Sequence, residues 1–490
     1  MATAPLKVCF IASEIAPLAK TGGLADVAGA LAKYLHGEGH DIRVFVPLYR
    51  QIDRQQIQMS PVESLRDIPV QLGPHLLRFS VQTAQLPGSA TPIHLVDAPA
   101  LFDRDRIYGS APDEHLRFIL LTHAAFLCCQ RMAFAPQILH CNDWHTGFGP
   151  LLLKTVYAWD RLFHGTRSLM SIHNLAYQGV FGAADTADIG LGDSAHLLDA
   201  GDRAGGRVNP LREGIAHAHA LSTVSPTYAL EIQTPEYGHG LDGLLRSRAG
   251  ALTGILNGVD YEDWDPRVDR FLPRHFDADK LAVKQALKRA FAHRLGLALP
   301  PRQRTPLVGI VSRMAWQKGL DLLLTALPQL LAKHRFCLAV LGSGEERYES
   351  FFRVMAALYP ARVHFRSGYS EEHAHWIEAA SDMFLMPSLY EPCGLNQMYS
   401  QRYGTIPIVR RTGGLADSVR HFDPATGEGT GVVFNDYDAG AVTWGMETAL
   451  AWYAKKPLWQ RLVGNAMAED FSWQRRVEDY VALYRRMLGG

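Results

Sequence analysis

Short apolar runs alternate with longer stretches of helical periodicity along this chain, and the alternation restricts the fold more than any other feature. Runs of this kind, rich in Val, Ile, Leu and Phe, are typical of strands buried on both faces of a parallel sheet. The first series of predicted strands covers residues 7–12, 42–46, 93–96, 138–141, 168–172 and 221–224. A second series covers residues 307–311, 336–341, 362–365, 383–386, 406–409 and 431–434. The pattern predicts an α/β fold.

The two series indicate two main domains, because 490 residues exceed what one hydrophobic core accommodates. A turn-rich segment around Asn257 separates them. We therefore expect an N-terminal domain of residues 1–253 and a C-terminal domain of residues 254–471. Residues 472–490 have the pattern of an amphipathic helix that could cross back to the first domain.

One hexapeptide occurs twice, as Thr21-Gly22-Gly23-Leu24-Ala25-Asp26 and as Thr412-Gly413-Gly414-Leu415-Ala416-Asp417. Each copy follows a predicted strand and opens a predicted helix. A glycine pair allows a ligand close to the backbone, and the N–H groups at a helix start attract anions. Although a lone Gly-Gly is often an ordinary turn, the repeat indicates two halves that share one anionic ligand.

The overall charge gives no support to nucleic-acid or membrane binding, because 49 basic residues balance 49 acidic residues. The six cysteines lack the spacing of a zinc site or a disulfide framework. There is no apolar run of membrane-spanning length, and the first ten residues do not resemble a signal peptide. We expect a cytoplasmic protein without a membrane partner.

Two cations after the first strand of the second series point to a phosphate ligand. Arg313 follows the strand, and Lys318 stands where a helical stripe of leucines begins. A cation at a helix start opposes the helix dipole unless an anion lies nearby, which favours a diphosphate site over an ordinary surface lysine. Pro328 within the same stripe predicts a kink or an early end of that helix.

Polar residues also stand at other predicted strand ends. Glu391 precedes a predicted helix starting at about Gly394, where it is either a complement to the helix dipole or a functional group. In the first half, the strand ends deliver Asp143 and the pair His173-Asn174 towards one crevice. They could form a sugar-binding wall with Trp144, although a structural histidine and a core tryptophan are the alternatives.

These features suit the transfer of a sugar from a nucleotide diphosphate. The departing diphosphate needs cations and helix N–H groups, and the sugar hydroxyls need oriented acceptors. Arg313, Lys318 and the glycine turns can meet the first need. The polar groups at the strand ends, which are His173, Asn174, Asp143 and Glu391, could meet the second.

The motifs resemble those of the glycogen/starch synthase family of retaining glycosyltransferases almost from end to end. The matching segments are residues 20–24, 140–145, 172–179, 223–228, 254–260, 312–313, 317–320 and 391–395. The resemblance implies a GT-B fold, with two Rossmann-like domains facing each other across a deep cleft. It also implies transfer of glucose from ADP-glucose to the non-reducing end of glycogen or an α-1,4-glucan primer, in glycogen biosynthesis, with no metal and no cofactor.

The resemblance assigns the acceptor side to the N-terminal domain and the nucleotide sugar to the C-terminal domain. The expected catalytic residues are His173, Glu391, Arg313 and Lys318. Together with the strand-end residues above, the expected substrate-binding residues are Lys20, Gly22, Gly23, Asp26, Asp143, Asn174, Asn257, Tyr369, Cys393, Gly394 and Leu395. Among these, Lys20 and the first glycine turn would face the donor, and Tyr369 would pack on its base. Either an attack on the face that the diphosphate leaves or a covalent route through a carboxylate would retain configuration.

The sequence differs from the family pattern at Leu389-Tyr390, where Arg-Phe is usual. A related GT-B enzyme using another nucleotide sugar is one alternative, but many such enzymes carry a second Glu where this chain has Met398. A metal-dependent transferase is another, since DxD spacing occurs at residues 103–105, 263–265 and 436–438, where solvated loop charge is the preferred interpretation. A non-catalytic glucan-binding protein is the third.

Overall fold

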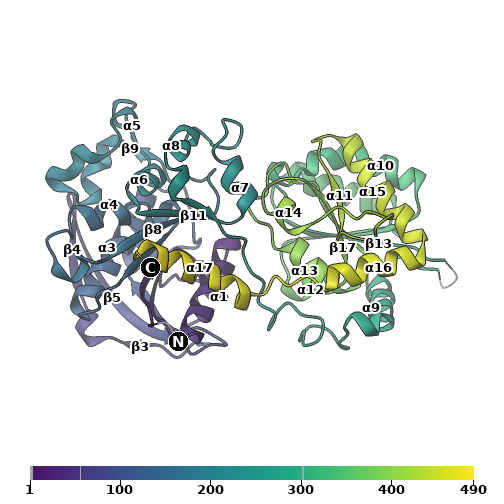
Figure 1. Ribbon diagram of the computed structural model, residues 1–490, viewed down its shortest axis with the longest axis horizontal. Coiled ribbons are helices and arrows are strands. Elements are labelled where there is room, and N and C mark those ends of the chain that lie inside the picture. Colours follow the sequence, from purple (N-terminus) through teal and green to yellow (C-terminus); the bar gives the residue numbers. More distant parts are fainter. Residues whose placement is uncertain (1–3, 56, 301–302, 490) are drawn as a thin grey trace. The chain divides into compact units, whose positions relative to one another are not determined.

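The computed structural model describes residues 4–55, 57–300 and 303–489, and the chain divides into two units (Figure 1). Unit 1 comprises Met1–Val224, Ala229–Ile255 and Trp473–Gly490. Unit 2 comprises Ser225–Tyr228 and Leu256–Ser472. The chain therefore enters unit 2 after Ile255 and returns to unit 1 at Trp473, while the short segment Ser225–Tyr228 belongs to unit 2 by its contacts.

Unit 1 is built on one large sheet whose strand order is β12-β11-β8-β7-β1-β2-β6-β5-β3, with β4 paired to β5. The parallel strands are β1 (Lys7–Ile11), β2 (Asp41–Pro47), β6 (Pro92–Asp97), β7 (Ile138–Asn142), β8 (Arg167–Ile172), β11 (Ala220–Thr223) and β12 (Leu252–Gly254). All six strands predicted for this half are present. Their apolar runs identify them because the central strands are buried on both faces.

An antiparallel extension was not predicted. It consists of β3 (Ser60–Pro61), β4 (Ile68–Leu72) and β5 (His75–Gln85), which pair at the β6 edge of the sheet. In β4 and much of β5, buried residues alternate with exposed or half-exposed ones, so no continuous apolar run marks these strands. A second small sheet pairs β9 (Phe181–Gly182) with β10 (Arg207–Val208).

The helices of unit 1 cover its sheet. They are α1 (Gly23–Gly37), α2 (Pro99–Phe102), α3 (Glu114–Arg131), α4 (Gly149–Lys154), α5 (Ala200–Ala204), α6 (Pro210–His217), α8 (Asp242–Ser247) and α17 (Trp473–Met487), whereas α7 (Pro226–Glu231) begins in unit 2 and ends in unit 1. Short 3-10 turns are η1 (Glu63–Leu65), η2 (Trp144–Thr146), η3 (Arg161–Phe163), η4 (Ala183–Ile189), η5 (Gly192–Leu197) and η6 (Ala249–Ala251). The C-terminal helix α17 packs beside α1, and its Tyr484 hydroxyl lies 2.7 Å from Nδ1 of the buried His140 in β7.

Unit 2 has an entirely parallel sheet with the order β15-β14-β13-β16-β17-β18. Its strands are β13 (Leu307–Val311), β14 (Cys337–Gly342), β15 (Val363–Ser367), β16 (Met383–Met386), β17 (Ile406–Arg410) and β18 (Val432–Phe434). Successive side chains point to opposite faces, so Leu338 and Val340 of β14 join one core cluster while Ala339 and Leu341 join another. All six strands predicted for this half are present.

Helices lie on both faces of this sheet (Figure 1). They are α9 (Leu281–Arg294), α10 (Leu320–Lys333), α11 (Glu346–Leu358), α12 (Glu371–Ala380), α13 (Asn396–Arg402), α14 (Gly413–Ser418), α15 (Ala439–Ala454) and α16 (Lys456–Met467), with the 3-10 turns η7 (Ala278–Lys280) and η8 (Trp316–Lys318). Helix α10 continues past Pro328 to Lys333, so the predicted early end is wrong. Buried leucines on both sides of the proline hold the helix in place. No helix in the described part of the chain is long and apolar enough to cross a membrane.

Candidate active site

Both sheets change strand order beside their first strand. In unit 1, β1 lies between β2 and β7, and in unit 2, β13 lies between β14 and β16. In open parallel sheets, ligands bind outside the carboxyl ends of the strands at such a switch point. The loops after β1 and β7, and those after β13 and β16, are therefore where functional side chains are expected in each unit.

The first glycine turn leads from β1 into α1 in unit 1. Lys20 Nζ lies 2.6 Å from Oδ1 of Asp26 in the first turn of α1. A Cβ placed on Gly22 or Gly23 meets no heavy atom of the described residues within 4 Å. Packing in this unit does not require glycine at either position, which leaves the backbone open to close approach by a ligand.

The second glycine turn packs against its own unit instead. A Cβ on Gly413 would lie 2.0 Å from the carbonyl oxygen of Glu391, and one on Gly414 would lie 2.1 Å from that of Cys393. The Gly414 N–H donates to the carbonyl oxygens of Glu391 and Pro392 at 3.1 and 3.2 Å. The predicted anion contact is thus not open to this N–H, and the turn supports the loop around Glu391.

The Asp143 carboxylate organises the loop after β8. Its Oδ1 accepts the backbone N–H of His173 at 2.7 Å and that of Asn174 at 3.4 Å. Burial raises the pKa of Asp143 to about 7, although these two N–H groups act in the opposite direction. The Asn174 side chain accepts the N–H of Ala176 at 3.1 Å. Asp143 and Asn174 therefore fix the backbone beside His173.

Asp143 also has a strained backbone, with φ 54° and ψ −175°. Residues other than glycine rarely adopt this backbone conformation. It costs about 1–3 kcal/mol and occurs mainly at functional sites. The Asp143 N–H donates to the carbonyl oxygen of Ser171 at 2.9 Å, and its own carbonyl accepts the N–H of Thr146 at 3.1 Å. These contacts hold the unusual geometry at the end of β7.

His173 is a neutral, oriented hydrogen-bonding group. Its Nε2 lies 2.9 Å from Oδ1 of Asn142, whose Nδ2 donates to the carbonyl oxygen of Ile11 at 3.0 Å. Burial lowers the pKa of His173 to about 3. Because Asn142 presents an oxygen, the neutral ring donates through Nε2 and keeps Nδ1 as an acceptor. An acceptor at Nδ1 suits a sugar hydroxyl.

Trp144 is half-buried and packs on neighbouring rings of unit 1. Its ring stacks on His145 at a centroid distance of 4.1 Å and makes an edge contact with Phe118 at 5.1 Å. A Cβ on Gly179 would lie 2.0 Å from the indole ring. These contacts hold one part of the ring by packing within the unit, while its half-buried state leaves both the sugar-binding and the structural interpretation open.

The two cations after β13 share a loop with Gln317. Arg313 donates from Nη2 to Gln317 Oε1 at 3.3 Å. Gln317 is buried, donates from Nε2 to the carbonyl oxygen of Tyr390 at 3.2 Å and accepts the Leu389 N–H on its own carbonyl at 2.9 Å. Gln317 thereby joins the loop of Arg313 and Lys318 to the loop that carries Glu391.

Lys318 and Glu391 form a largely buried ion pair. Lys318 Nζ lies 2.6 Å from Glu391 Oε2, which also accepts the Ser388 hydroxyl at 3.0 Å. The side chains are 19% and 6% exposed. A lysine near a helix start is favoured by a nearby anion, and Glu391 is an anion of the chain itself in that place. Two residues predicted separately thus act on each other directly.

The residues after Glu391 form a tight turn. Gly394 has φ 70°, and a Cβ there would lie 2.5 Å from Oε1 of Gln397. Helix α13 begins at Asn396, close to the predicted start at about Gly394, and the left-handed Gly394 precedes its first turn. The Cys393 thiol is buried.

Asn257 and Tyr369 both lie in unit 2. Asn257 is 4% exposed, and its Oδ1 has no hydrogen-bond partner among the described residues. Tyr369 follows β15 and is 65% exposed. A buried amide oxygen without a donor and an exposed ring are both suited to a ligand.

Three residues that were not predicted as site residues contact the predicted ones or their loops: Glu14, Asn142 and Gln317. Glu14 binds the first glycine turn, Asn142 sets the hydrogen bonding of His173, and Gln317 links the two loops of unit 2. A sequence signal existed for Glu14, since a carboxylate directly follows an apolar strand. Asn142 and Gln317 are uncharged and gave no comparable signal.

The DxD segments differ in exposure: Asp103 and Asp105 are exposed, as expected of solvated loop charge, whereas Asp265 is buried. Asp103 and Asp105 each lie 2.8 Å from Arg50, and Asp438 accepts the N–H of Ala441 at the start of α15. Asp265 is buried and ion-paired with Arg267 and Arg402, so solvated loop charge was the wrong interpretation there. Over the described residues, no three His, Cys, Asp or Glu side chains are grouped to hold a metal ion.

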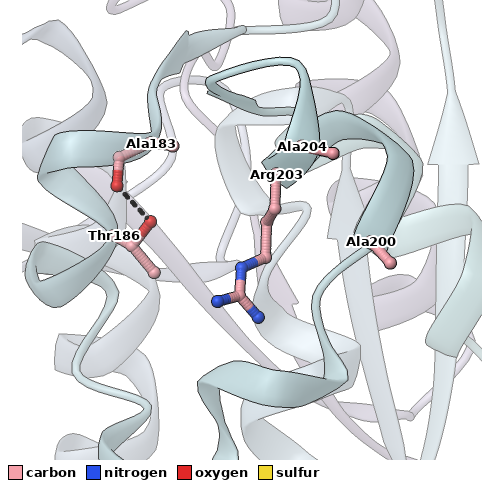
Figure 2. A pocket seen from close by; sticks show the side chains of 5 residues that line it. All are labelled: Ala183, Thr186, Ala200, Arg203 and Ala204. Carbon is pink, nitrogen blue, oxygen red and sulfur yellow. Dashed lines mark hydrogen bonds between the residues drawn. The ribbon is translucent and has the colours of Figure 1, made fainter.

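A pocket in unit 1 lies apart from these groups (Figure 2). It is lined by Ala183, Thr186, Ala200, Arg203 and Ala204. The Thr186 hydroxyl donates to the Ala183 carbonyl oxygen at 2.6 Å, and Arg203 donates to the Ala195 carbonyl oxygen at 3.2 Å. None of the predicted site residues lines it.

Comparison with known proteins connects these features. The family model described as "Starch synthase catalytic domain" matches residues 7–247, and "Glycosyl transferases group 1" matches residues 298–462. The chain is 42% identical to "Glycogen synthase 1" of Geobacter metallireducens, over 99% of this chain and 96% of that protein. It is 44% identical to "Glycogen synthase" of Anaeromyxobacter dehalogenans strain 2CP-C, over 98% and 100%.

Solved structures agree. The catalytic domain of starch synthase IV from Arabidopsis thaliana, bound to ADP and acarbose, is similar with a TM-score of 0.91 and 33% identity, over 99% of this chain and 100% of that one. Sucrose-phosphate synthase from Thermosynechococcus elongatus shares the fold with a TM-score of 0.62 at 17% identity. The two α/β units, each with parallel strands around its switch point, together with these matches show a glycosyltransferase of the GT-B fold. The chain belongs to the glycogen and starch synthase family, whose activity is the synthesis of glycogen or starch from a nucleotide sugar and a glucan.

Proposed function

We propose that this glycosyltransferase transfers glucose from ADP-glucose to the non-reducing end of an α-1,4-glucan with retention of the anomeric configuration. The Lys318–Glu391 pair is the observation that carries the proposal, because it holds a cation and a carboxylate at the switch point of unit 2. Support for the adenine nucleotide comes from the Arabidopsis starch synthase, which was solved with ADP. The free, buried cysteines are in keeping with a reducing cytoplasm as the site of this activity.

In this proposal, the residues of unit 2 bind the nucleotide sugar. Arg313 and Lys318 hold the diphosphate, and their charges stabilise it as it departs. Glu391, within reach of Lys318, contacts the transferred glucose. The exposed ring of Tyr369 packs on the base. The turn formed by Cys393, Gly394 and Leu395 keeps Glu391 in position.

The residues of unit 1 complete the proposed chemistry. Lys20 and the open turn at Gly22 and Gly23 bind the donor, and His173 accepts a glucose hydroxyl at Nδ1. Asp143 and Asn174 hold the loop that carries His173.

Two further residues, Asp26 and Asn257, support the substrate-bound state in this proposal. Asp26 orients the Lys20 amine, with 2.6 Å between Nζ and Oδ1. Asn257 has a buried Oδ1 to offer to a donor hydrogen.

The test is incubation of the purified protein with glycogen and ADP-glucose labelled in the sugar. We expect label in polymer that an α-1,4-specific glucanase releases. A panel containing UDP-glucose checks the donor: turnover with UDP-sugars and none with ADP-glucose would contradict the proposal. An inactive protein that still binds glycogen would support a non-catalytic role instead.

A further inference from the structure

Glu14 is a buried carboxylate that the proposed chemistry does not use. It lies just after β1 and is 3% exposed. One oxygen, Oε2, accepts the backbone N–H of Thr21 and that of Gly22, the latter at 3.3 Å. The other, Oε1, accepts the Thr21 hydroxyl at 2.8 Å and the Tyr108 hydroxyl at 2.5 Å.

These four hydrogen-bond donors offset the free-energy cost of burying the Glu14 carboxylate. Burial raises the pKa of Glu14, and the hydrogen bonds from Tyr108, Thr21 and Gly22 act against that rise. The Tyr108 hydroxyl lies 2.8 Å from Ser13 Oγ, which fixes its position. A buried carboxylate is unfavourable unless its oxygens are satisfied, and a satisfied one holds its donors in a defined geometry. Three of the four donors belong to the first glycine turn.

The two copies of the hexapeptide are held by different contacts. At Gly413 and Gly414 the backbone of Glu391 and Cys393 lies so close that a Cβ would be 2.0–2.1 Å away. At Gly22 and Gly23 no heavy atom of the described residues lies within 4 Å of a Cβ. One turn is held by backbone packing, whereas the other is open on that side and needs another constraint. The hydrogen bonds of Glu14 to Thr21 and Gly22 supply it.

We propose that Glu14 is a positioning residue for donor binding: it fixes the backbone of residues 20–22 so that Lys20 and the start of α1 are preorganised for the phosphates of the nucleotide sugar. This inference rests on the proposed function. Because the N–H groups of Thr21 and Gly22 are already donated to Glu14, the donor contacts fall to Lys20 and to the remaining N–H groups of the first turn. Tyr108 holds the carboxylate in turn.

Two substitutions separate hydrogen bonding from charge. In Glu14→Gln the amide oxygen can accept both backbone N–H groups, and the two hydroxyls can rotate to accept the amide hydrogens. In Glu14→Ala all four donors lose their acceptor. We expect KM for ADP-glucose to rise about 10- to 100-fold in Glu14→Ala, with a smaller change in kcat, and to stay within about threefold of wild type in Glu14→Gln.

Hydrogen–deuterium exchange supplies a readout that does not depend on turnover. We expect the amides of Thr21 and Gly22 to exchange faster in Glu14→Ala than in wild type or Glu14→Gln. Thr21→Val, which removes one donor and keeps the carboxylate, provides a second test should Glu14→Ala fail to fold, and we expect an intermediate KM. Glu63→Ala is the matched control, since Glu63 is an exposed carboxylate of unit 1 and should leave both readouts unchanged.

The outcomes distinguish this inference from the proposed function. Unchanged KM in a folded Glu14→Ala protein, or a Glu14→Gln protein as impaired as Glu14→Ala, would overturn the positioning role. If wild type transfers no glucose from ADP-glucose, the proposed function fails. The exchange rates then still decide whether Glu14 holds the turn, and unchanged exchange in Glu14→Ala would refute that as well.

Discussion

Replacement of Lys318 by Met should lower both the stability of unit 2 and kcat, and a second substitution should restore only the stability. The change removes the cation 2.6 Å from Glu391 and leaves a carboxylate that is 6% exposed, with the Ser388 hydroxyl at 3.0 Å as its remaining donor among the described residues. Breaking a buried pair on one side costs about 3–5 kcal/mol, because the other charge stays buried. Since the Lys318 side chain is 19% exposed, water can partly reach the site, and we expect the lower end, about 3 kcal/mol.

The second substitution tests the cause. Adding Glu391→Gln removes the uncompensated charge, so Lys318→Met/Glu391→Gln should be more stable than Lys318→Met alone. For a unit of this size, 3 kcal/mol corresponds to a decrease in Tm of about 6–12 °C, which scanning calorimetry resolves. Activity should not follow stability. We expect kcat to decrease by at least about 10²- to 10³-fold in both variants, because both lack the cation that stabilises the leaving diphosphate and the double variant also lacks the Glu391 carboxylate.

Lys333→Met is the matched control. Lys333 also pairs with a glutamate in unit 2, at 2.7 Å from Glu447, but its side chain is 69% exposed. Water screens such a pair, so we expect no measurable change in Tm or kcat. An unchanged Tm in Lys318→Met, or a double variant no more stable than the single one, would refute the argument from buried charge.

Three more predictions follow from particular contacts. Gly414→Ala should lower Tm by several degrees, because its Cβ would lie 2.1 Å from a carbonyl oxygen, whereas Gly22→Ala should leave Tm unchanged and raise the donor KM. Asp143→Asn should remove a transition near pH 7 from the profile of kcat/KM, since burial raises the pKa of Asp143 to about 7. Tyr484→Phe should lower stability by about 1–3 kcal/mol, measured by thermal unfolding, because buried His140 loses a hydrogen-bond partner.

The raised pKa of Asp143 also predicts how the stability of the protein changes with pH. The folded-state pKa of Asp143 lies above its unfolded value, so the folded protein binds a proton that the unfolded chain has lost between about pH 4 and pH 7. This group therefore makes stability decrease as the pH rises through that window. Asp143→Asn should flatten that part of the stability profile, and an unaltered slope would contradict the assignment. Equal Tm values for Gly414→Ala and Gly22→Ala, or for Tyr484→Phe and wild type, would contradict the other two predictions.

The strands of both sheets were predictable because their signal is local. A strand buried on both faces is a continuous apolar run, and each of the twelve predicted runs is a strand. Strands β4 and β5 were not predicted, because their buried and exposed residues alternate and form no continuous apolar run. Helix α10 passed through Pro328 because its leucine stripe, buried in the core, outweighs a local breaker.

The candidate site residues could likewise be predicted from their residue types and positions in the sequence. The residues that they contact could not. The sequence showed that Lys318 needed an anion, and only folding brought Glu391 to it across 73 positions of chain. The same holds for Asn142 beside His173, whose neutral amide carries no signal until the ring is placed against it.

The repeated hexapeptide separates the two kinds of information. In both places the six letters predicted a glycine turn and a helix start, which depend on backbone freedom and local periodicity, and a separate apolar run predicted the strand before them. Whether a turn is open or packed depends on residues outside the hexapeptide: the backbone of Glu391 and Cys393 packs against the second turn, whereas Glu14 binds the first one and no described heavy atom lies within 4 Å of a Cβ at Gly22 or Gly23. Local backbone and side-chain properties therefore determine the turn and the helix start, and tertiary packing determines whether the turn is open to a ligand.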